Sequence, residues 1–153
     1  MTADRVVTIP AAKQDVASWN EIGRGGFPEY VGFRVVEVGD GLLRAELELR
    51  AEHMAPQGFL HAGVVVTLAD TAAGYGCLAH LPEGALDFTT VELKANFLRT
   101  AREGTLRCEA RAVHLGRTTQ VWDATVRTNV DKRPLAVFRC TQLALYPRGA
   151  SAA

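Results

Sequence analysis

The sequence has little of what marks a metalloprotein, a disulfide-rich secreted protein or a nucleic-acid binder. Its 153 residues include three cysteines and four histidines, and these lie too far apart for any Cys-x-x-Cys or Cys/His ligand spacing. We therefore expect no metal, and we expect Cys77, Cys108 and Cys140 to be buried, reduced thiols in a cytoplasmic protein. Basic and acidic residues balance at 17 each. This balance gives no reason to expect nucleic acid or an anionic membrane as a partner.

Targeting and repeat signals are also scarce. The opening residues, MTADRVVTIP, contain no long apolar run, so they do not read as a secretory signal. The length of 153 residues and the hydrophobic content of 48% are typical of one domain with a substantial core. We expect residues 1–27 to form an N-terminal arm and a short helix over Ala11 to Ile22. Residues 28–147 would form the main domain and residues 148–153 a C-terminal tail.

The stretch from His61 to Leu81, HAGVVVTLADTAAGYGCLAHL, is the most informative part of the chain. It is apolar or small almost throughout, with one acidic group, Asp70, near its middle. A charge at that depth of a membrane span costs about 2.5–3.5 kcal/mol, so a buried soluble helix is favoured over a membrane helix. Gly74 and Gly76 weaken the helix but let another element pack close to it. A lone carboxylate in a core helix is costly and is therefore a candidate for chemistry.

The remaining chain reads as strands joined by short turns. Strand patterns cover Val31–Val38, Leu43–Leu49, Thr89–Arg99, Thr105–Leu115, Thr118–Asn129 and Leu135–Leu145. We expect the last four to form an antiparallel meander. A helix that is apolar all round must be wrapped by a curved sheet, and one chain of this length leaves part of it open. A second copy would cover the open side, which predicts a homodimer.

The segment GFLHAGVVVTLADTAAGYG resembles the signature of hotdog-fold acyl-CoA thioesterases of the phenylacetate-degradation type. His61 matches the histidine of that signature, Ala62 and Gly63 match its two glycines, and Asp70 matches its catalytic carboxylate. The resemblance implies an α+β hotdog fold, in which a curved antiparallel sheet of about six strands wraps a long central helix. It also implies hydrolysis of an acyl-CoA to a carboxylic acid and free coenzyme A, with no cofactor beyond the coenzyme A of the substrate. Family members place their active sites at dimer interfaces and commonly form tetramers.

Roles follow for the matched residues. Asp70 would act as a general base toward water or as a nucleophile that forms an anhydride. The alternative is a structural role, in which the carboxylate serves as a cap or pairs with another group inside the dimer. The N–H groups of Ala62 and Gly63 would polarise the thioester carbonyl. His61 would either cap the helix or contact the substrate. Asp70 lies nine residues after His61, half a turn away and about 13.5 Å along a helix, so a partner chain must bring the two together.

Three departures from the family pattern concern helper residues. Ala62 replaces the first glycine, Ala55 occupies the place of a polar residue, and Gly74 occupies the place of a small hydroxyl residue. Gln57 and Thr90 are the replacements that we expect to hold the substrate or the attacking water. For the phosphates of coenzyme A we expect Arg117 and Thr118. Further candidates for those phosphates are Lys94, Arg99 and Arg102.

Two other functions on the same fold remain open from the sequence. The first is a protein that binds or senses acyl-CoA without catalysis, against which Asp70 and the lack of a helix-turn-helix extension argue. The second is a dehydratase or hydratase, whose chemistry requires a histidine and an acid arranged for proton transfer at carbon. The order of His61 and Asp70 fits hydrolysis better.

Overall fold

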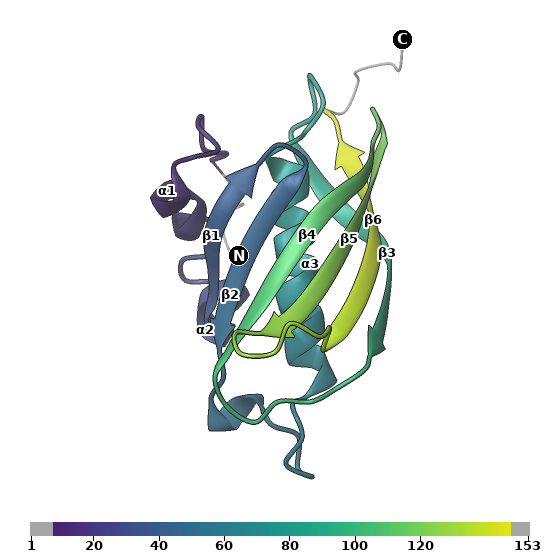
Figure 1. Ribbon diagram of the computed structural model, residues 1–153. Coiled ribbons are helices and arrows are strands. Elements are labelled where there is room, and N and C mark those ends of the chain that lie inside the picture. The colour runs from purple at the N-terminus through teal and green to yellow at the C-terminus, as the bar shows by residue number, and fades with distance from the viewer. Residues whose placement is uncertain (1–7, 148–153) are drawn as a thin grey trace, which may run out of the picture.

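The computed structural model describes residues 8–147, in which one long helix lies against a curved antiparallel sheet (Figure 1). The arm predicted for residues 1–7 and the tail predicted for residues 148–153 lie outside the described residues. The strands are β1 (Phe33–Gly39), β2 (Leu42–Glu48), β3 (Asp87–Phe97), β4 (Thr105–Leu115), β5 (Thr119–Thr128) and β6 (Ala136–Leu145). The helices are α1 (Val16–Glu21), α2 (Phe27–Val31), the single 3₁₀ turn η1 (Ala51–His53) and α3 (Ala62–Leu78).

The six strands form one sheet in the order β1-β2-β4-β5-β6-β3, and every neighbouring pair is antiparallel. Helix α3 contacts all six strands from the concave face. Buried positions alternate with more exposed ones along β5 and β6 and along β4 as far as Ala110, which is the pattern of strands with one face against a core. The predicted hotdog fold, with a central helix and about six strands, is confirmed.

The prediction of a four-strand meander is wrong for β3. This strand pairs with β6 at the far edge of the sheet, and β2 takes the place beside β4. Residues 98–104 connect β3, at the edge of the sheet, to β4. The N–H of Leu98, at the start of this connection, donates to the carbonyl of Leu135 (2.8 Å). The alternation within a strand shows which face is buried but not which strand lies beside it. The order is set by the packing of all strands around α3.

The N-terminal elements also differ from expectation. The short helix begins at Val16 rather than Ala11, because Asp15 caps it by accepting from the N–H of Ser18 (3.2 Å). A second short helix, α2, which the sequence analysis did not predict, ends at Val31, where the predicted strand was to begin. Pro28 is tolerated in the first turn of α2, where no N–H is needed. Gly32 ends this helix with φ at +84°, and β1 begins at Phe33.

Glycines let the sheet approach α3, as the sequence predicts. A Cβ atom at Gly74 would lie 2.7 Å from the ring of Phe88, and one at Gly76 would lie 2.8 Å from the ring of Trp122. Helix α3 ends at Leu78, three residues earlier than expected. No helix within residues 8–147 has both the length and the apolar character needed to cross a bilayer.

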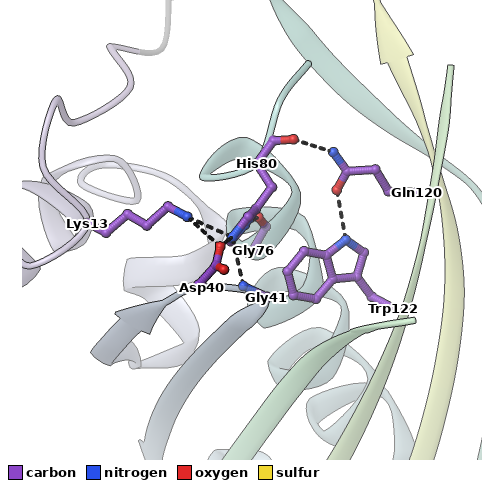
Figure 2. A network of polar contacts seen from close by, with 7 residues as sticks. All are labelled: Lys13, Asp40, Gly41, Gly76, His80, Gln120 and Trp122. Atoms are coloured by element: carbon purple, nitrogen blue, oxygen red, sulfur yellow. Dashed lines mark hydrogen bonds and ion pairs between the residues drawn. The ribbon is translucent and has the colours of Figure 1, made fainter. Parts of the chain in front are cut away.

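A polar network fixes the C-terminal end of α3 to the sheet (Figure 2). His80 Nε2 accepts from the N–H of Gly41 (2.8 Å), so the ring proton lies on Nδ1 and is donated to the carbonyl of Gly76 (2.8 Å). The side chain of Gln120 donates to the carbonyl of His80 (2.7 Å) and accepts from Trp122 Nε1 (2.9 Å). These bonds satisfy buried polar groups at the point where the helix ends.

Candidate active site

Asp70 and Thr90 are the two predicted site residues that the fold brings into contact. Asp70 lies midway along α3 and is half-buried, and Thr90 lies on the inner face of β3. Thr90 Oγ1 is 3.2 Å from Asp70 Oδ1. The neighbouring residues of α3 on this side, Val66, Thr67 and Thr71, are also only half-buried. The carboxylate therefore lies on the part of α3 that its own sheet leaves open.

Burial raises the pKa of Asp70 above its ordinary value, and the hydrogen bond from Thr90 opposes this effect. A carboxylate with a raised pKa is a stronger base and a stronger nucleophile than one in water. The nearest thiol from the sheet, Cys140, is buried and its pKa is raised to about 12, so it stays neutral. All three cysteines are buried and unpaired, as predicted.

The start of α3 forms a second group of predicted residues. His61 is the N-cap, and its Nδ1 accepts from the N–H of Gly63 (2.9 Å), which places the ring proton on Nε2. The carbonyl of His61 accepts from the N–H of Val64 (3.0 Å). For the Ala62 N–H, the described part of the chain provides no acceptor. The helix start thus keeps one backbone donor available, and Gly63, expected to be a second, donates to the cap instead.

His61 fits its capping position because Gly63 has no side chain. A Cβ atom at Gly63 would lie 2.9 Å from His61 Nδ1. This close approach explains why a glycine is needed one residue after Ala62. Within one chain, Ala62 and Asp70 are eight residues and about 12 Å apart along α3. The Ala62 N–H and the Asp70 carboxylate therefore lie at different places on one helix.

Gln57 lies on an exposed loop before α3. The loop is closed by the N–H of Ala55 donating to the carbonyl of Phe59 (2.7 Å). Arg102 holds it from outside, donating to the carbonyl of Gly58 (3.1 Å) and covering the ring of Phe59. Arg102, a candidate for binding phosphate, is therefore engaged in supporting this loop.

Arg117 and Thr118 lie in the turn between β4 and β5, near the opposite end of α3 from His61. The turn is closed by the N–H of Gly116 donating to the carbonyl of Thr119 (2.9 Å). Both side chains of interest are exposed. Of the other cationic candidates, Arg99 donates to the carbonyl of Pro134 (2.7 Å) and Lys94 to the side chain of Asn96. One chain does not gather these cations around Asp70.

Gln142 is a site residue that the sequence analysis missed. It is fully buried on β6, and its Oε1 lies 2.9 Å from Thr90 Oγ1. The signal was present in the alternation of β6, whose inward positions are Ala136, Phe138, Cys140, Gln142 and Ala144. A glutamine in such a row is a buried polar group that needs a partner.

The hydroxyl expected one turn after the carboxylate is absent for a steric reason. Position 74 is glycine, and the ring of Phe88 fills the space into which a side chain there would point. Thr90, two residues after Phe88 on the same face of β3, supplies a hydroxyl to Asp70 instead. In residues 8–147 no group of three His, Cys, Asp or Glu side chains could hold a metal ion.

The free edge of the sheet lies beside this site. Leu93 and Phe97 of β3 are in register with the core residues Cys140 and Ala136 of β6, yet they are 41% and 46% exposed. Val91, at the bulge of β3, is 54% exposed. Among residues 8–147, no strand pairs with the outer edge of β3, and this edge also carries apolar side chains, a combination typical of an interaction surface.

Comparisons with known proteins show the family to which the chain belongs. Residues 57–134 match the model of the thioesterase superfamily. The chain is 34% identical over 116 residues to the 1,4-dihydroxy-2-naphthoyl-CoA hydrolase of Listeria monocytogenes, covering 76% of this chain and 93% of that protein. It is 30% identical over 118 residues to the proofreading thioesterase EntH of Klebsiella pneumoniae, covering 77% and 85%. The chain belongs to the thioesterase superfamily and is a thioester hydrolase.

Solved structures support the same assignment. A variant of thioesterase PA1618 from Pseudomonas aeruginosa superposes with a TM-score of 0.82 at 28% identity, over 90% of this chain and 99% of that one. The PaaI protein of Escherichia coli, from the phenylacetic acid degradation operon, shares the fold, with a TM-score of 0.70 at 22% identity over 77% and 83% of the two chains. The predicted resemblance to a hotdog thioesterase of this type is confirmed.

Proposed function

We propose that the protein hydrolyses an acyl-CoA thioester to a carboxylic acid and free coenzyme A, at a site that two copies of the chain share. Asp70 of one copy activates the nucleophile, and the Ala62 N–H of the other polarises the thioester carbonyl. The observation that carries this proposal is the half-buried Asp70 on the open side of α3, held by Thr90. A core helix has no structural need for such a carboxylate.

The reaction has two routes that this carboxylate can serve. As a base, Asp70 takes a proton from water, the resulting hydroxide attacks the thioester carbon, and the C–S bond breaks to release the coenzyme A thiolate, which is then protonated. As a nucleophile, Asp70 displaces the thiolate and forms a mixed anhydride, which water hydrolyses to the acid and the free carboxylate. In both routes negative charge develops on the carbonyl oxygen, where a helix-start N–H stabilises it.

The geometry of one chain supports the proposal that the site is shared. The available N–H and the carboxylate are about 12 Å apart along α3, too far to act on one carbonyl group. Pairing of two β3 edges around a two-fold axis would cover Val91, Leu93 and Phe97 and set the two α3 helices side by side. We propose that the protein is a homodimer, or a dimer of such dimers, for this reason.

The substrate class is supported by the name of the Listeria relative, a coenzyme A thioester hydrolase. We propose that the exposed turn with Arg117 and Thr118 binds phosphate groups of coenzyme A, since guanidinium and hydroxyl groups suit phosphate. Gln57 would hold the carbonyl or the water from the loop before α3. The acyl group would lie beneath β3, beside Asp70 and Thr90.

Thiol release from a panel of acyl-CoAs, followed with a thiol-reactive dye, tests this function. We expect turnover of at least one acyl-CoA by the wild-type protein. Asp70→Asn should reduce turnover by roughly 10²–10⁴-fold without loss of substrate binding, the range typical of a lost general base. Binding of acyl-CoA without thiol release by the wild-type protein would instead identify a binding protein and overturn the proposal.

A further inference from the structure

Three polar side chains form one row across the inner face of the sheet. Thr90 of β3 pairs with Gln142 of β6, and Gln142 pairs with Gln120 of β5. Both glutamines are 0% exposed. The row begins at Asp70, because Thr90 contacts this carboxylate, and ends at the network under His80. A buried amide stabilises a fold only when its hydrogen-bonding atoms have partners. The partners of Gln142 and Gln120 therefore indicate the role of each side chain.

Thr90 has one hydroxyl proton and two acceptors within reach. Oε1 of Gln142 lies 2.9 Å from Thr90 Oγ1, and Oδ1 of Asp70 lies 3.2 Å from it. A hydroxyl donates one hydrogen bond at a time. The shorter distance favours donation to Gln142. The amide is held in this orientation because its Nε2 donates to Cys140 Sγ at 3.2 Å.

We propose that Gln142 is a positioning residue for Asp70: by competing for the Thr90 hydroxyl proton, it weakens the hydrogen bond from Thr90 to the carboxylate and keeps the carboxylate basic. The inference rests on the proposed function, in which Asp70 is the base or nucleophile. A carboxylate that accepts fewer hydrogen bonds is less stabilised as an anion and accepts a proton more readily. Gln142 therefore acts on the reaction through Thr90, without touching substrate.

Among the groups around Asp70, Thr90 is the contact that can change the pKa of the carboxylate. From β6, the thiol of Cys140 is neutral, with its pKa raised to about 12 by burial. From α3, the buried thiol of Cys77 is neutral for the same reason. The acidic residues of β3, Asp87 and Glu92, pair with Leu145 and Thr141, at positions that face away from α3.

Gln120 provides a matched control within the same row. It is as buried as Gln142, but its amide is bound to His80 and Trp122 rather than to Thr90 (Figure 2). Replacing either glutamine by methionine keeps the volume and removes buried hydrogen bonds. Both variants should lose stability, whereas only Gln142→Met should change the titration of Asp70.

The test is the pKa of Asp70, measured by NMR of carboxyl-labelled protein and assigned by loss of the signal in Asp70→Asn. We expect Gln142→Met to lower the midpoint by about one pH unit, since Thr90 then donates to the anion. The acid limb of kcat/KM should move down by the same amount. Gln120→Met should leave both midpoints in place. In a Thr90→Val background, Gln142→Met should have no further effect on the midpoint.

If Gln142→Met does not fold, Gln142→Asn is the second variant. Its side chain is shorter by one methylene, which places the amide out of reach of Thr90. We expect it to lower the midpoint of Asp70 in the same way. An unchanged or raised midpoint in the folded Gln142 variants would overturn the inference, as would an equal movement in Gln120→Met. The titration does not depend on turnover. An Asp70→Asn variant that still hydrolyses thioesters would therefore refute the proposed function separately.

Discussion

Thr90 Oγ1 lies 3.2 Å from Asp70 Oδ1, and this contact joins the edge strand of the sheet to the middle of the central helix. Strand β3 thus has two roles. Its inner face contacts the carboxylate, and its free edge carries the apolar side chains that a partner would cover. We propose that assembly and catalysis are coupled through this strand, because a partner that pairs with β3 would also cover Asp70.

Replacement of Asp70 by asparagine should stabilise the protein. The folded-state pKa of Asp70 is raised by burial, so the folded protein binds its proton more tightly than the unfolded chain does. Stability from this group is therefore fully present below about pH 4, the ordinary pKa of aspartate, and is lost as the pH rises through the raised value. In thermal unfolding between pH 4.5 and 8, the melting temperature of Asp70→Asn should exceed that of the wild-type protein by a margin that grows with pH. A constant or shrinking difference would contradict the raised pKa.

The two helix glycines should respond differently to alanine. Alanine favours a helix by up to about 1 kcal/mol over glycine. At Gly76 the new methyl group meets Trp122, which is fully buried and cannot move away, so we expect a net loss of about 1–3 kcal/mol. At Gly74 it meets the far end of Phe88, a half-buried ring on the edge strand, so the loss should be smaller. Urea unfolding of both variants measures the difference, and an equal or reversed order would contradict the packing described.

His61 should behave as a cap. His61→Ala removes the acceptor for the Gly63 N–H and should cost about 1 kcal/mol of folding free energy. His61→Asn keeps a capping oxygen and should retain most of that stability. Unfolding of the two variants in parallel provides the measurement. If both variants lose stability equally, the ring contributes by packing rather than by the hydrogen bond.

Val91 and Val113 offer a matched pair for testing the interface. Both lie at β-bulges and are 54% and 53% exposed, but Val91 is on the edge strand and Val113 is on the interior strand β4. Sedimentation of the wild-type protein should show a dimer or a larger assembly. Val91→Lys should shift it toward monomer by placing a charge at the pairing edge, whereas Val113→Lys should not. Equal behaviour of the two variants would place the interface elsewhere.

Much of the fold could be predicted because the helix and the strands each follow from a pattern in a short, continuous stretch of sequence. The apolar run around Asp70 defined α3, and the alternation in residues 105–145 defined three strands close to their observed bounds. The position of β3 could not be predicted, because pairing with β6 depends on contacts between residues about 50 positions apart. Helix α2 was not predicted, although a proline in the first turn, here Pro28, is compatible with a helix.

Only part of the candidate site could be predicted, because some of its contacts depend on how distant parts of the chain pack. Asp70 and Thr90 were each predicted as site residues because a motif and a family pattern placed them, but the contact between them was not predicted. Gln142 was missed because its only sign is one polar residue at an inward position of β6. Capping by His61 was one of its two predicted roles, and the structure shows that role, with the ring accepting from the N–H of Gly63.

The central claim, a site shared between two chains, is tested most directly by mixing two inactive variants. Asp70→Asn removes the carboxylate. Ala62→Pro removes the helix-start donor at a position where proline fits, because the Ala62 N–H has no acceptor within residues 8–147 and His61 has the extended ψ of 128° that a following proline requires. Sedimentation must first show that each variant assembles like the wild-type protein.

A mixed dimer pairs one site that carries both defects with one site that carries neither. After subunit exchange, thiol release should recover to as much as half of the wild-type activity per mixed dimer. If the carboxylate and the donor act within the same chain, each site of a mixed dimer keeps one defect. Activity that stays at the level of the separate variants would therefore contradict the shared site.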